Sequence, residues 1–244
     1  MELIEYIEVI CKFLKDYLIS SHQDGYVLGI SGGVDSSVCA ALIKKAIGKE
    51  KLHCLLMPID SLPADLEDGL TLVKDLDLSY NVIDMSKGYH EYLEEFTRNN
   101  IELDASTRGN LKARMRMASL YAYGQAHRCL VVGTDNMDES YVGYFTKYGD
   151  GGVDLLPIVY LTKSEVREVG RILGIRDSLV NRIPSAGLYE GQTDEKEMGI
   201  TYQDLDDYLL GKEINIEAKK RIQHLHNISE HKRVAIPRPM EFKR

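Results

Sequence analysis

The feature that most constrains the fold is the alternation of short apolar runs with segments of helical periodicity. Runs rich in Val, Ile, Leu and Cys occur at four places along the chain: 26–30, 51–59, 79–85 and 128–134. Strands that are apolar on both faces are typical of a parallel sheet, because helices cover both of its sides. The sequence therefore predicts an α/β fold with a doubly wound parallel sheet flanked by helices.

A fifth apolar run, 155–161, is interrupted by Pro157 and is expected to form an edge strand, for about five strands in all. In the longest helical segment, Leu111, Met115, Ala118 and Ala122 line one face. No repeat or linker divides the chain, so we expect one domain over residues 1–244. The apolar spacing predicts helices at about 2–20, 35–47, 63–76, 86–98, 106–127, 162–174, 201–210 and 214–227.

The composition excludes several classes of protein. Hydrophobic residues make up 44% of the chain, which is too many for intrinsic disorder. No stretch approaches the roughly 18 apolar residues of a membrane-spanning helix, and the N-terminus lacks the features of a signal peptide. We therefore expect a cytoplasmic protein with no membrane partner. The net charge of −8 disfavours a nucleic-acid partner but not a small anionic ligand.

The four cysteines show no spacing that is typical of a zinc site or a redox pair. They are Cys11, Cys39, Cys54 and Cys129. Because free cysteine is among the most buried residue types, we expect four buried, reduced thiols.

The segment after the first apolar run combines the features of a phosphate-binding loop. It reads Ser31-Gly32-Gly33-Val34-Asp35-Ser36 and leads into the helix predicted at 35–47. Glycines allow close backbone approach, serines offer hydroxyl donors, and the N-terminus of a helix attracts anions. The segment matches neither the Walker A motif nor the dinucleotide fingerprint. A plain strand-to-helix turn capped by Asp35 or Ser36 is the alternative interpretation.

This S-G-G-x-D-S loop resembles the pyrophosphatase loop of enzymes that convert ATP to AMP and pyrophosphate. Within that superfamily, most of the chain resembles the ammonia-dependent NAD synthetases. The resemblance implies an adenine-nucleotide alpha-hydrolase-like fold and a ligase that adenylates the carboxylate of deamido-NAD with ATP and then displaces AMP with ammonia. The blocks that carry it are KARMRM (112–117), VVGTDNMDESYVGYFTKYGDGGVDLLPI (131–158), the run from Pro184 through GLYEGQTDEKEMGITYQDLDDYL (184–209) and HKR (231–233).

The resemblance also implies roles for individual residues. Asp35 and Lys163 would be catalytic, and Asp35 and Glu139 would bind Mg²⁺, for which carboxylate oxygens are suitable ligands. Two positions depart from the common family pattern: Val34 replaces a frequent Gln, and Ser185 replaces a Thr. The implied ATP site consists of Gly29, Ile30, Ser31, Gly32, Gly33, Val34, Asp35, Ser36, Thr134, Lys163 and Ser185. The implied deamido-NAD contacts are Arg114, Lys147, Asp154, His231 and Lys232.

Taken alone, some of these residues have simpler interpretations. Arg114 and Lys163 are each consistent with an ordinary surface charge, and Glu139 with a solvated acid at the start of a helix. The segment 184–200 combines Gly, Pro and acidic residues. It is either a mobile surface loop or a lid that excludes water from the adenylate.

The resemblance and the apolar surface together predict a homodimer. The N-terminal helix and the stretch MASLYAYG (117–124) offer more apolar surface than one sheet needs for cover. No glutaminase domain is expected, because none of the cysteines has the setting of a nucleophile.

Two other functions stay open at this point. A different pyrophosphatase-loop enzyme, such as a tRNA-modifying one, is disfavoured by the acidic charge and the lack of paired cysteines. A nucleotide-binding sensor of the same fold would not need the Asp35 and Glu139 pair.

Overall fold

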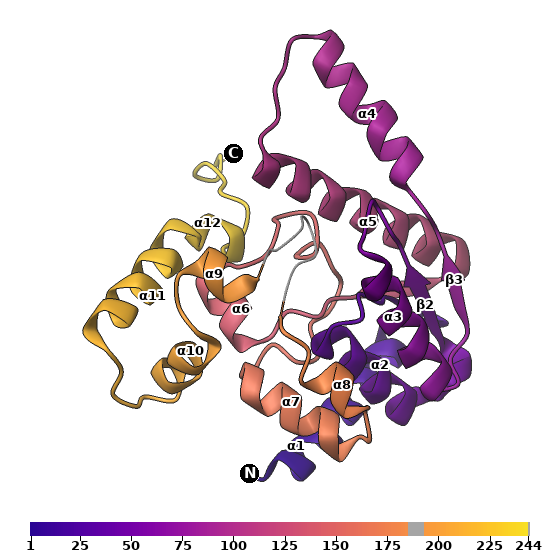
Figure 1. Cartoon of the computed structure of the whole chain (residues 1–244). Coiled ribbons are helices and arrows are strands. Elements are labelled where there is room, and N and C mark those ends of the chain that lie inside the picture. Colours follow the sequence, from indigo (N-terminus) through magenta and orange to yellow (C-terminus); the bar gives the residue numbers. More distant parts are fainter. Residues whose placement is uncertain (185–192, 244) are drawn as a thin grey trace.

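The computed structural model describes residues 1–184 and 193–243. Its centre is a parallel sheet with the strand order β3-β2-β1-β4 (Figure 1). The chain moves outward from β1 to β3 and then returns to the other side of β1 for β4, so the winding direction reverses between β1 and β4. The strands are β1 Gly25–Gly29, β2 Leu52–Leu56, β3 Tyr80–Val82 and β4 Cys129–Val132. The parallel, doubly wound sheet that the apolar runs predict is thus confirmed.

The prediction of a fifth strand at 155–161 is wrong. Leu155 forms a single parallel bridge with Val132 of β4. The chain then turns over residues 157–160. Pro157 has no N–H to continue the ladder, so the apolar run ends its pairing after one residue.

The predicted helices are all present, with bounds that differ by a few residues. Four short helices, α6, α8, α9 and α12, were not predicted, because four to six residues are too few to show a helical period. The helices are α1 Leu3–Ser20, α2 Val34–Ile47, α3 Pro63–Asp75, α4 Ser86–Arg98, α5 Ala105–His127, α6 Met137–Val142, α7 Lys163–Ile172, α8 Asp177–Val180, α9 Asp194–Met198, α10 Tyr202–Leu209, α11 Ile216–Ile228 and α12 Glu230–Arg233.

Alternate side chains of the strands enter two cores on opposite faces of the sheet. Tyr26 and Leu28 pack into the larger core with helices α1, α2 and α7. Val27, between them, packs on the other face with Leu120 and Tyr123 of α5. The two layers explain why the strands are apolar on both sides.

The face of α5 that packs on the sheet is not the one that the apolar spacing indicated. Ala118 and Ala122 of the predicted face are exposed, whereas Gly124 is buried. A Cβ on Gly124 would lie 2.8 Å from the carbonyl oxygen of Cys129 and 3.3 Å from a methyl of Val27. The glycine therefore lets the helix approach the sheet closely, and that contact outweighs the apolar pattern.

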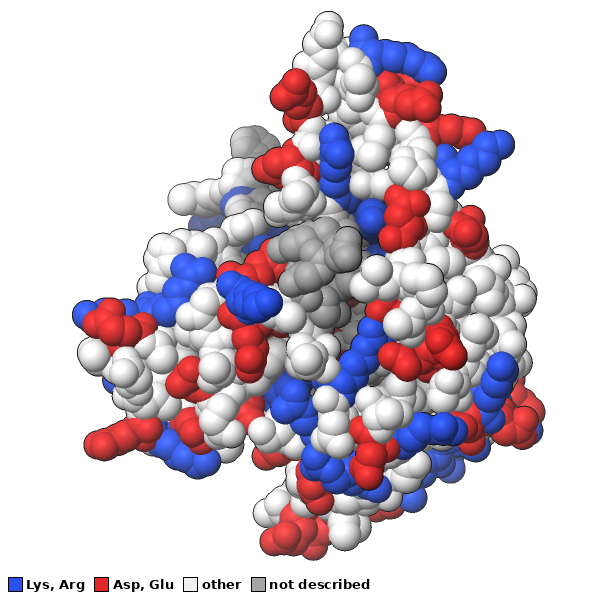
Figure 2. Space-filling view, in the orientation of Figure 1, with Lys and Arg blue, Asp and Glu red and all other residues white. Residues whose placement is uncertain are grey.

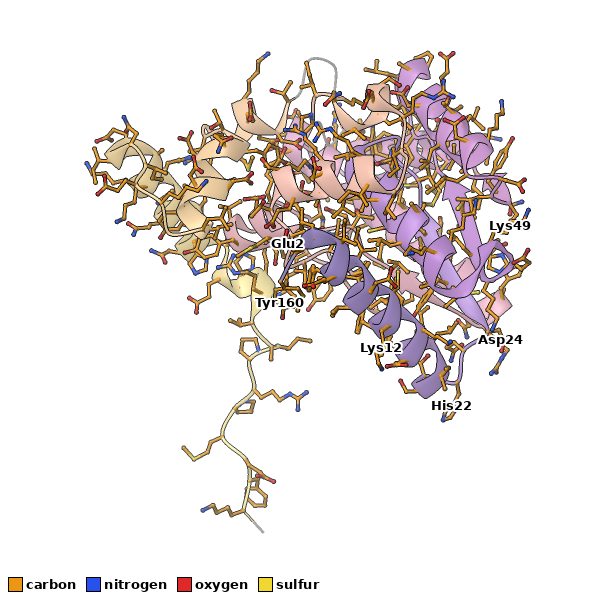
Figure 3. All side chains as sticks on the ribbon, turned by 90° about the horizontal axis from the view of Figure 1, so that it is seen from below. Glu2, Lys12, His22, Asp24, Lys49 and Tyr160 are labelled. Carbon is orange, nitrogen blue, oxygen red and sulfur yellow. The ribbon has the colours of Figure 1, made fainter. Side chains whose placement is uncertain are left out.

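A smaller core lies outside the two sheet layers. It joins α6, α9, α10 and α11 through buried residues that include Val142, Met198, Leu205 and Ile222. Helix α4 projects from the body and buries only Tyr89 (Figure 1). Beyond α12, the exposed residues 234–243 extend away from the body (Figure 3).

Basic and acidic side chains are interspersed on the face that Figure 2 shows. All four cysteines are buried and free, as expected. Over the described residues, no helix is both long and apolar enough to cross a membrane.

Candidate active site

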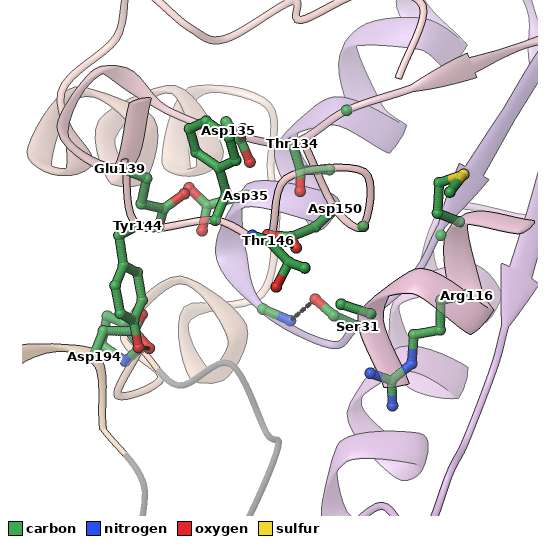
Figure 4. A pocket seen from close by; sticks show the side chains of 18 of the residues that line it. Ser31, Asp35, Arg116, Thr134, Asp135, Glu139, Tyr144, Thr146, Asp150 and Asp194 are labelled. Carbon is green, nitrogen blue, oxygen red and sulfur yellow. Dashed lines mark hydrogen bonds between the residues drawn. The ribbon is translucent and has the colours of Figure 1, made fainter. Parts of the chain in front are cut away.

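A pocket of about 470 Å³ opens at the carboxyl edge of the sheet (Figure 4). Gly29 at the end of β1, the two residues after it, and residues 133–135, which follow β4, all line it. Helix α5 closes one side, and the starts of α2 and α7 contribute Asp35 and Lys163. This is the place where open parallel sheets bind ligands, because the winding direction reverses there.

The loop between β1 and α2 is held by its own serines. Ser31 Oγ accepts a hydrogen bond from Gly33 N at 3.2 Å, and Ser36 Oγ accepts one from Ser31 N at 3.3 Å. Ser36 and Ser37 both donate to the carbonyl of Gly33, which is the N-cap residue of α2. The start of α2, where backbone N–H groups lack intrahelical partners, thus lines the pocket in a fixed arrangement that suits an anion.

Gly32 occupies a position that only glycine fits. Its φ is +80°, and a Cβ there would lie 2.8 Å from Arg182 Nη1 and 2.9 Å from both Asp65 O and Asp68 Cβ. The left-handed backbone and the crowding act together, so any side chain must displace the loop or its neighbours.

If the loop binds the ATP that the resemblance implies, we expect Gly32→Ala to lower turnover by about tenfold to a hundredfold, since a displaced loop would misplace the nucleotide. Gly211→Ala is the matched control: its φ is +76°, but nothing lies within 4 Å of the added carbon. The control should lose about 1–2 kcal/mol of stability to the left-handed backbone and keep its turnover. Initial rates and thermal unfolding of both variants test this. Equal losses of turnover would contradict the role of the loop.

The centre of the pocket holds one buried cation between two carboxylates. Lys163 Nζ lies 2.6 Å from Asp35 Oδ2 and 3.0 Å from Glu139 Oε1. Burial lowers the pKa of Lys163, but the two carboxylates outweigh this effect and raise the pKa above its usual value. The ammonium group therefore stays charged, and it can stabilise negative charge that develops beside it.

Caps at the starts of short helices position these three side chains. Thr162 caps α7 in a capping box, and the N–H of Lys163 donates to Asp138 Oδ2 at 2.6 Å. Asn136 caps α6, in which Glu139 occupies the third position. The Asn136 amide also donates to Asp35 Oδ1 at 2.9 Å, which links α6 to the phosphate loop.

A second layer from the smaller core supports this centre. Tyr202 Oη lies 2.9 Å from Glu139 Oε1 and 2.9 Å from Asp194 Oδ2, and it can donate to one of them. Lys163 Nζ lies 4.7 Å from the centre of the Tyr202 ring. Burial, reinforced by Glu139 and Asp194, raises the pKa of Tyr202, so its hydroxyl remains a donor. Tyr144 Oη lies 3.2 Å from the other carboxylate oxygen of Asp194, Oδ1.

The residues that the resemblance assigns to deamido-NAD lie in two places. Arg114 donates to the carbonyl of Lys147 at 3.3 Å, and Lys147 donates to the carbonyl of His231 at 2.5 Å. Lys232 donates to two carbonyls that follow α6 and lines the pocket. Asp154 accepts hydrogen bonds from Val131 N and Tyr121 Oη outside the pocket lining. The substrate roles of these residues stay predictions.

The pocket gathers most of the predicted ATP and metal residues. Ser185 lies outside the described residues, as does part of the predicted lid at 184–200. Within the described part of that segment, the N–H of Asp194 donates to the carbonyl of Pro184 at 3.2 Å. The pocket lining includes Gly29, Ile30, Ser31, Gly33, Val34, Asp35, Thr134, Glu139, Lys163 and Lys232. It does not include Gly32, Ser36, Arg114, Lys147, Asp154 or His231.

Several pocket residues were not singled out from the sequence. Asp135 and Asp150 line the pocket, and burial, followed by the charge of Asp150, raises the pKa of Asp135. Arg116 and Arg182 also line it. Asp135, Asp150 and Arg116 fall inside the sequence blocks that resemble the synthetases, and this position is the feature of the sequence that could have identified them as site residues.

Comparison with known proteins agrees with this geometry. The family model described as NAD synthase matches residues 6–236. The NH(3)-dependent NAD(+) synthetase of Mesoplasma florum is 44% identical over 245 residues, which cover 100% of both chains. A solved structure of NMN synthetase from Francisella tularensis has a TM-score of 0.93 at 39% identity and covers 99% of this chain and 100% of that one.

An NH3-dependent NAD synthetase from Campylobacter jejuni, solved in complex with the nitrate ion, has a TM-score of 0.79 at 30% identity. That match covers 99% of this chain and 100% of the other. Because the family model and the relatives span almost the whole chain, the match includes the phosphate loop, the Lys163 centre and the C-terminal helices. The chain belongs to the NAD synthase family.

Proposed function

We propose that this protein amidates the nicotinate carboxylate of deamido-NAD, using ATP and ammonia, to give NAD, AMP and pyrophosphate. The observation that carries the proposal is the buried Lys163 between Asp35 and Glu139, directly beside the phosphate loop. A carboxylate does not react with ammonia, because its carbon is a poor electrophile. Transfer of AMP to the carboxylate supplies a leaving group, and that step needs a site that stabilises charge on phosphate.

Each part of the pocket has a role in that reaction. The loop 31–36 and the N-terminus of α2 bind the ATP phosphates through backbone N–H groups. Lys163 stabilises the negative charge that passes to the leaving pyrophosphate. Helix α5 and the loops after β2 and β4 enclose the nucleotide and hold the carboxylate oxygen close to the α-phosphorus.

Asp35 and Glu139 are suited to bind Mg²⁺ together with the nucleotide. Both carboxylates converge on one cation, Lys163 Nζ, so their oxygens share one small region. Among the residues that the structure describes, no group of three or more His, Cys, Asp or Glu side chains forms a complete metal site. That fits Mg²⁺, which usually takes one or two carboxylates and completes its shell with phosphate oxygens and water. When bound, the ion would neutralise part of the charge on the pyrophosphate.

A second candidate substrate is the corresponding mononucleotide. It is favoured by the TM-score of 0.93 with a protein titled NMN synthetase, whereas the Campylobacter NAD synthetase gives 0.79. The chemistry at the carboxylate would be the same. The difference lies in whether an adenylyl half of the substrate must also be bound.

The test is to measure AMP and pyrophosphate release from the purified chain with ATP and Mg²⁺. With deamido-NAD and ammonium present, we expect AMP and pyrophosphate to be released in equal amounts. Without the nicotinate nucleotide, we expect neither to be released. Nicotinate mononucleotide in place of deamido-NAD decides between the two candidates through the ratio of kcat/KM values. AMP release that does not depend on any nicotinate nucleotide would contradict both.

We further propose that residues 1–244 act as one synthetase domain that uses free ammonia. Glutamine hydrolysis needs an activated nucleophile, usually a cysteine with a base. All four cysteines are buried, and burial raises the pKa of Cys54 to about 12 and that of Cys129 to about 11. Replacing ammonium with ammonia-free glutamine should therefore abolish product formation. Comparable rates with both donors would demand an amidase site in this chain.

We also propose a homodimer. Large apolar side chains are exposed on α1, among them Ile4, Val9 and Phe13, and Tyr121 is exposed on α5. Two-fold dimers are the commonest assembly that covers such surface. Sedimentation at micromolar concentration should give twice the 27.6 kDa chain mass, and the single-chain mass would contradict it. A cytoplasmic location without nucleic-acid or membrane partners stays a prediction.

A further inference from the structure

Arg116 is a basic side chain of the pocket that lies apart from the centre formed by Lys163, Asp35 and Glu139. It extends from the middle of α5 and lines the pocket beside Met117 of the same helix. Its Nε donates to the carbonyl of Met57 at 3.0 Å, and one Nη donates to Ser61 Oγ at 3.4 Å. A guanidinium group has five N–H donors. The contacts with described residues therefore leave three donors for another partner.

No carboxylate of the described residues forms an ion pair with Arg116. The two nearby acids are engaged elsewhere: Asp65 pairs with Arg182, and Asp150 Oδ1 accepts the N–H of Thr146 at 2.9 Å. Burial lowers the pKa of Arg116, and Asp150 and Asp65 oppose this only in part. A largely buried cation without a paired anion is destabilising, unless a ligand brings the negative charge.

The position of Arg116 indicates which part of a nucleotide it would meet. Its partners Met57 and Ser61 follow β2, whereas Asp35, Glu139 and Lys163 lie beyond β1 and β4. In Figure 4, Ser31 of the phosphate loop lies between Arg116 on one side and Asp35 and Glu139 on the other. A nucleotide with its pyrophosphate end at Lys163 must therefore extend its adenosine end toward β2, and its α-phosphoryl group lies between the two.

We propose that Arg116 binds the α-phosphoryl group of ATP and of the acyl-adenylate that follows. The inference rests on the proposed adenylation. A carboxylate oxygen attacks the α-phosphorus, the bond to the bridging oxygen of the β-phosphate breaks, and pyrophosphate leaves with the electron pair. The two non-bridging α-oxygens stay on phosphorus throughout, so the N–H donors of Arg116 can hold one of them in every state.

A purely structural role is the alternative, since Arg116 also joins α5 to the loop after β2. In that case the loss of Arg116 would lower the stability of the protein and would lower the rates with all nucleotide analogues by the same factor. Contact with one non-bridging α-oxygen would instead depend on which oxygen is replaced. ATP in which sulfur replaces either non-bridging α-oxygen exists as two diastereomers, and these provide the test.

The experiment measures AMP or thio-AMP release with the full chain, ammonium and the nicotinate nucleotide, for wild type, R116Q and R116K. We expect wild type to use one diastereomer about 10- to 100-fold more slowly than the other. R116Q should turn over ATP about a hundredfold more slowly and should lose that discrimination. R116K keeps the charge without the fork and should show a reduced ratio, which tests the proposal even if R116Q does not fold.

The matched control is Arg108→Gln, which removes an exposed arginine from the first turn of the same helix. It should keep both the rate and the discrimination of wild type. Discrimination by R116Q and R116K equal to that of wild type, or none in wild type itself, overturns the proposal. If wild type releases no AMP with any nicotinate nucleotide, the proposed function fails first, and the inference fails with it.

Discussion

Asp35→Asn is expected to lower turnover by about a hundredfold or more while the protein stays folded. The carboxylate of Asp35 accepts hydrogen bonds from Lys163 Nζ at 2.6 Å and from the Asn136 amide at 2.9 Å. Asparagine keeps the shape but removes the charge, so the site loses one of the two ligands suited to Mg²⁺ and part of the field that orients Lys163. Steady-state rates at saturating ATP, nicotinate nucleotide and Mg²⁺ measure the effect.

Asp75→Asn is the matched control for that substitution. Asp75 also pairs with a basic residue, Arg176, at 2.7 Å, but on the surface and away from the pocket. It should leave turnover within about twofold of wild type, because exposed ion pairs contribute little. Near-normal turnover of Asp35→Asn at saturating Mg²⁺ would remove Asp35 from the reaction.

Lys163→Met is expected to abolish measurable turnover and to destabilise the fold. Lys163 is buried, and its removal leaves Asp35 and Glu139 close together without their shared cation. Breaking a buried ion pair from one side costs about 3–5 kcal/mol. Chemical denaturation of the variant and of wild type at neutral pH gives the difference in the free energy of unfolding.

The stability deficit of Lys163→Met should shrink as the pH falls. Burial raises the pKa of Glu139, and Lys163 opposes that shift, so its removal raises the pKa further. A carboxyl group whose pKa is raised in the folded state binds its proton more tightly there than in the unfolded state. The variant is therefore most stable at low pH, and this contribution to its free energy of unfolding is lost as the pH rises through the folded-state pKa. The variant Lys163→Met/Asp35→Asn removes one of the two facing charges and should recover stability without activity. A deficit that grows on acidification would contradict this electrostatic account.

The parts of the site that the sequence predicted are those encoded within a few residues of a strand end. The S-G-G-x-D-S segment begins shortly after β1, and Thr134, which the resemblance assigned, lies shortly after β4, so strand order brings them to one edge of the sheet. Lys163 and Glu139 came from the resemblance and also line the pocket. Their burial next to Asp35 depends on contacts between distant segments, which no local pattern contains.

The parts that escaped prediction depend on tertiary packing. Tyr202 and Asp194 reach Glu139 only because α9 and α10 pack with α6 in the smaller core. The apolar spacing of α5 indicated a face that includes Ala118, but the need for close approach at Gly124 decided which face packs. The apolar run at 155–161 has the composition of a strand, but its pairing with β4 ends before Pro157, because proline has no N–H to donate.

Oxygen labelling tests directly whether the carboxylate is adenylated before ammonia attacks. The nicotinate nucleotide is prepared with ¹⁸O in both carboxylate oxygens, and AMP and the amide product are analysed by mass spectrometry after turnover with ammonium. If the carboxylate attacks the α-phosphorus, each turnover transfers one labelled oxygen to the phosphate of AMP and leaves the other in the carboxamide. Unlabelled AMP, with the label found instead in inorganic phosphate or in water, would contradict the account.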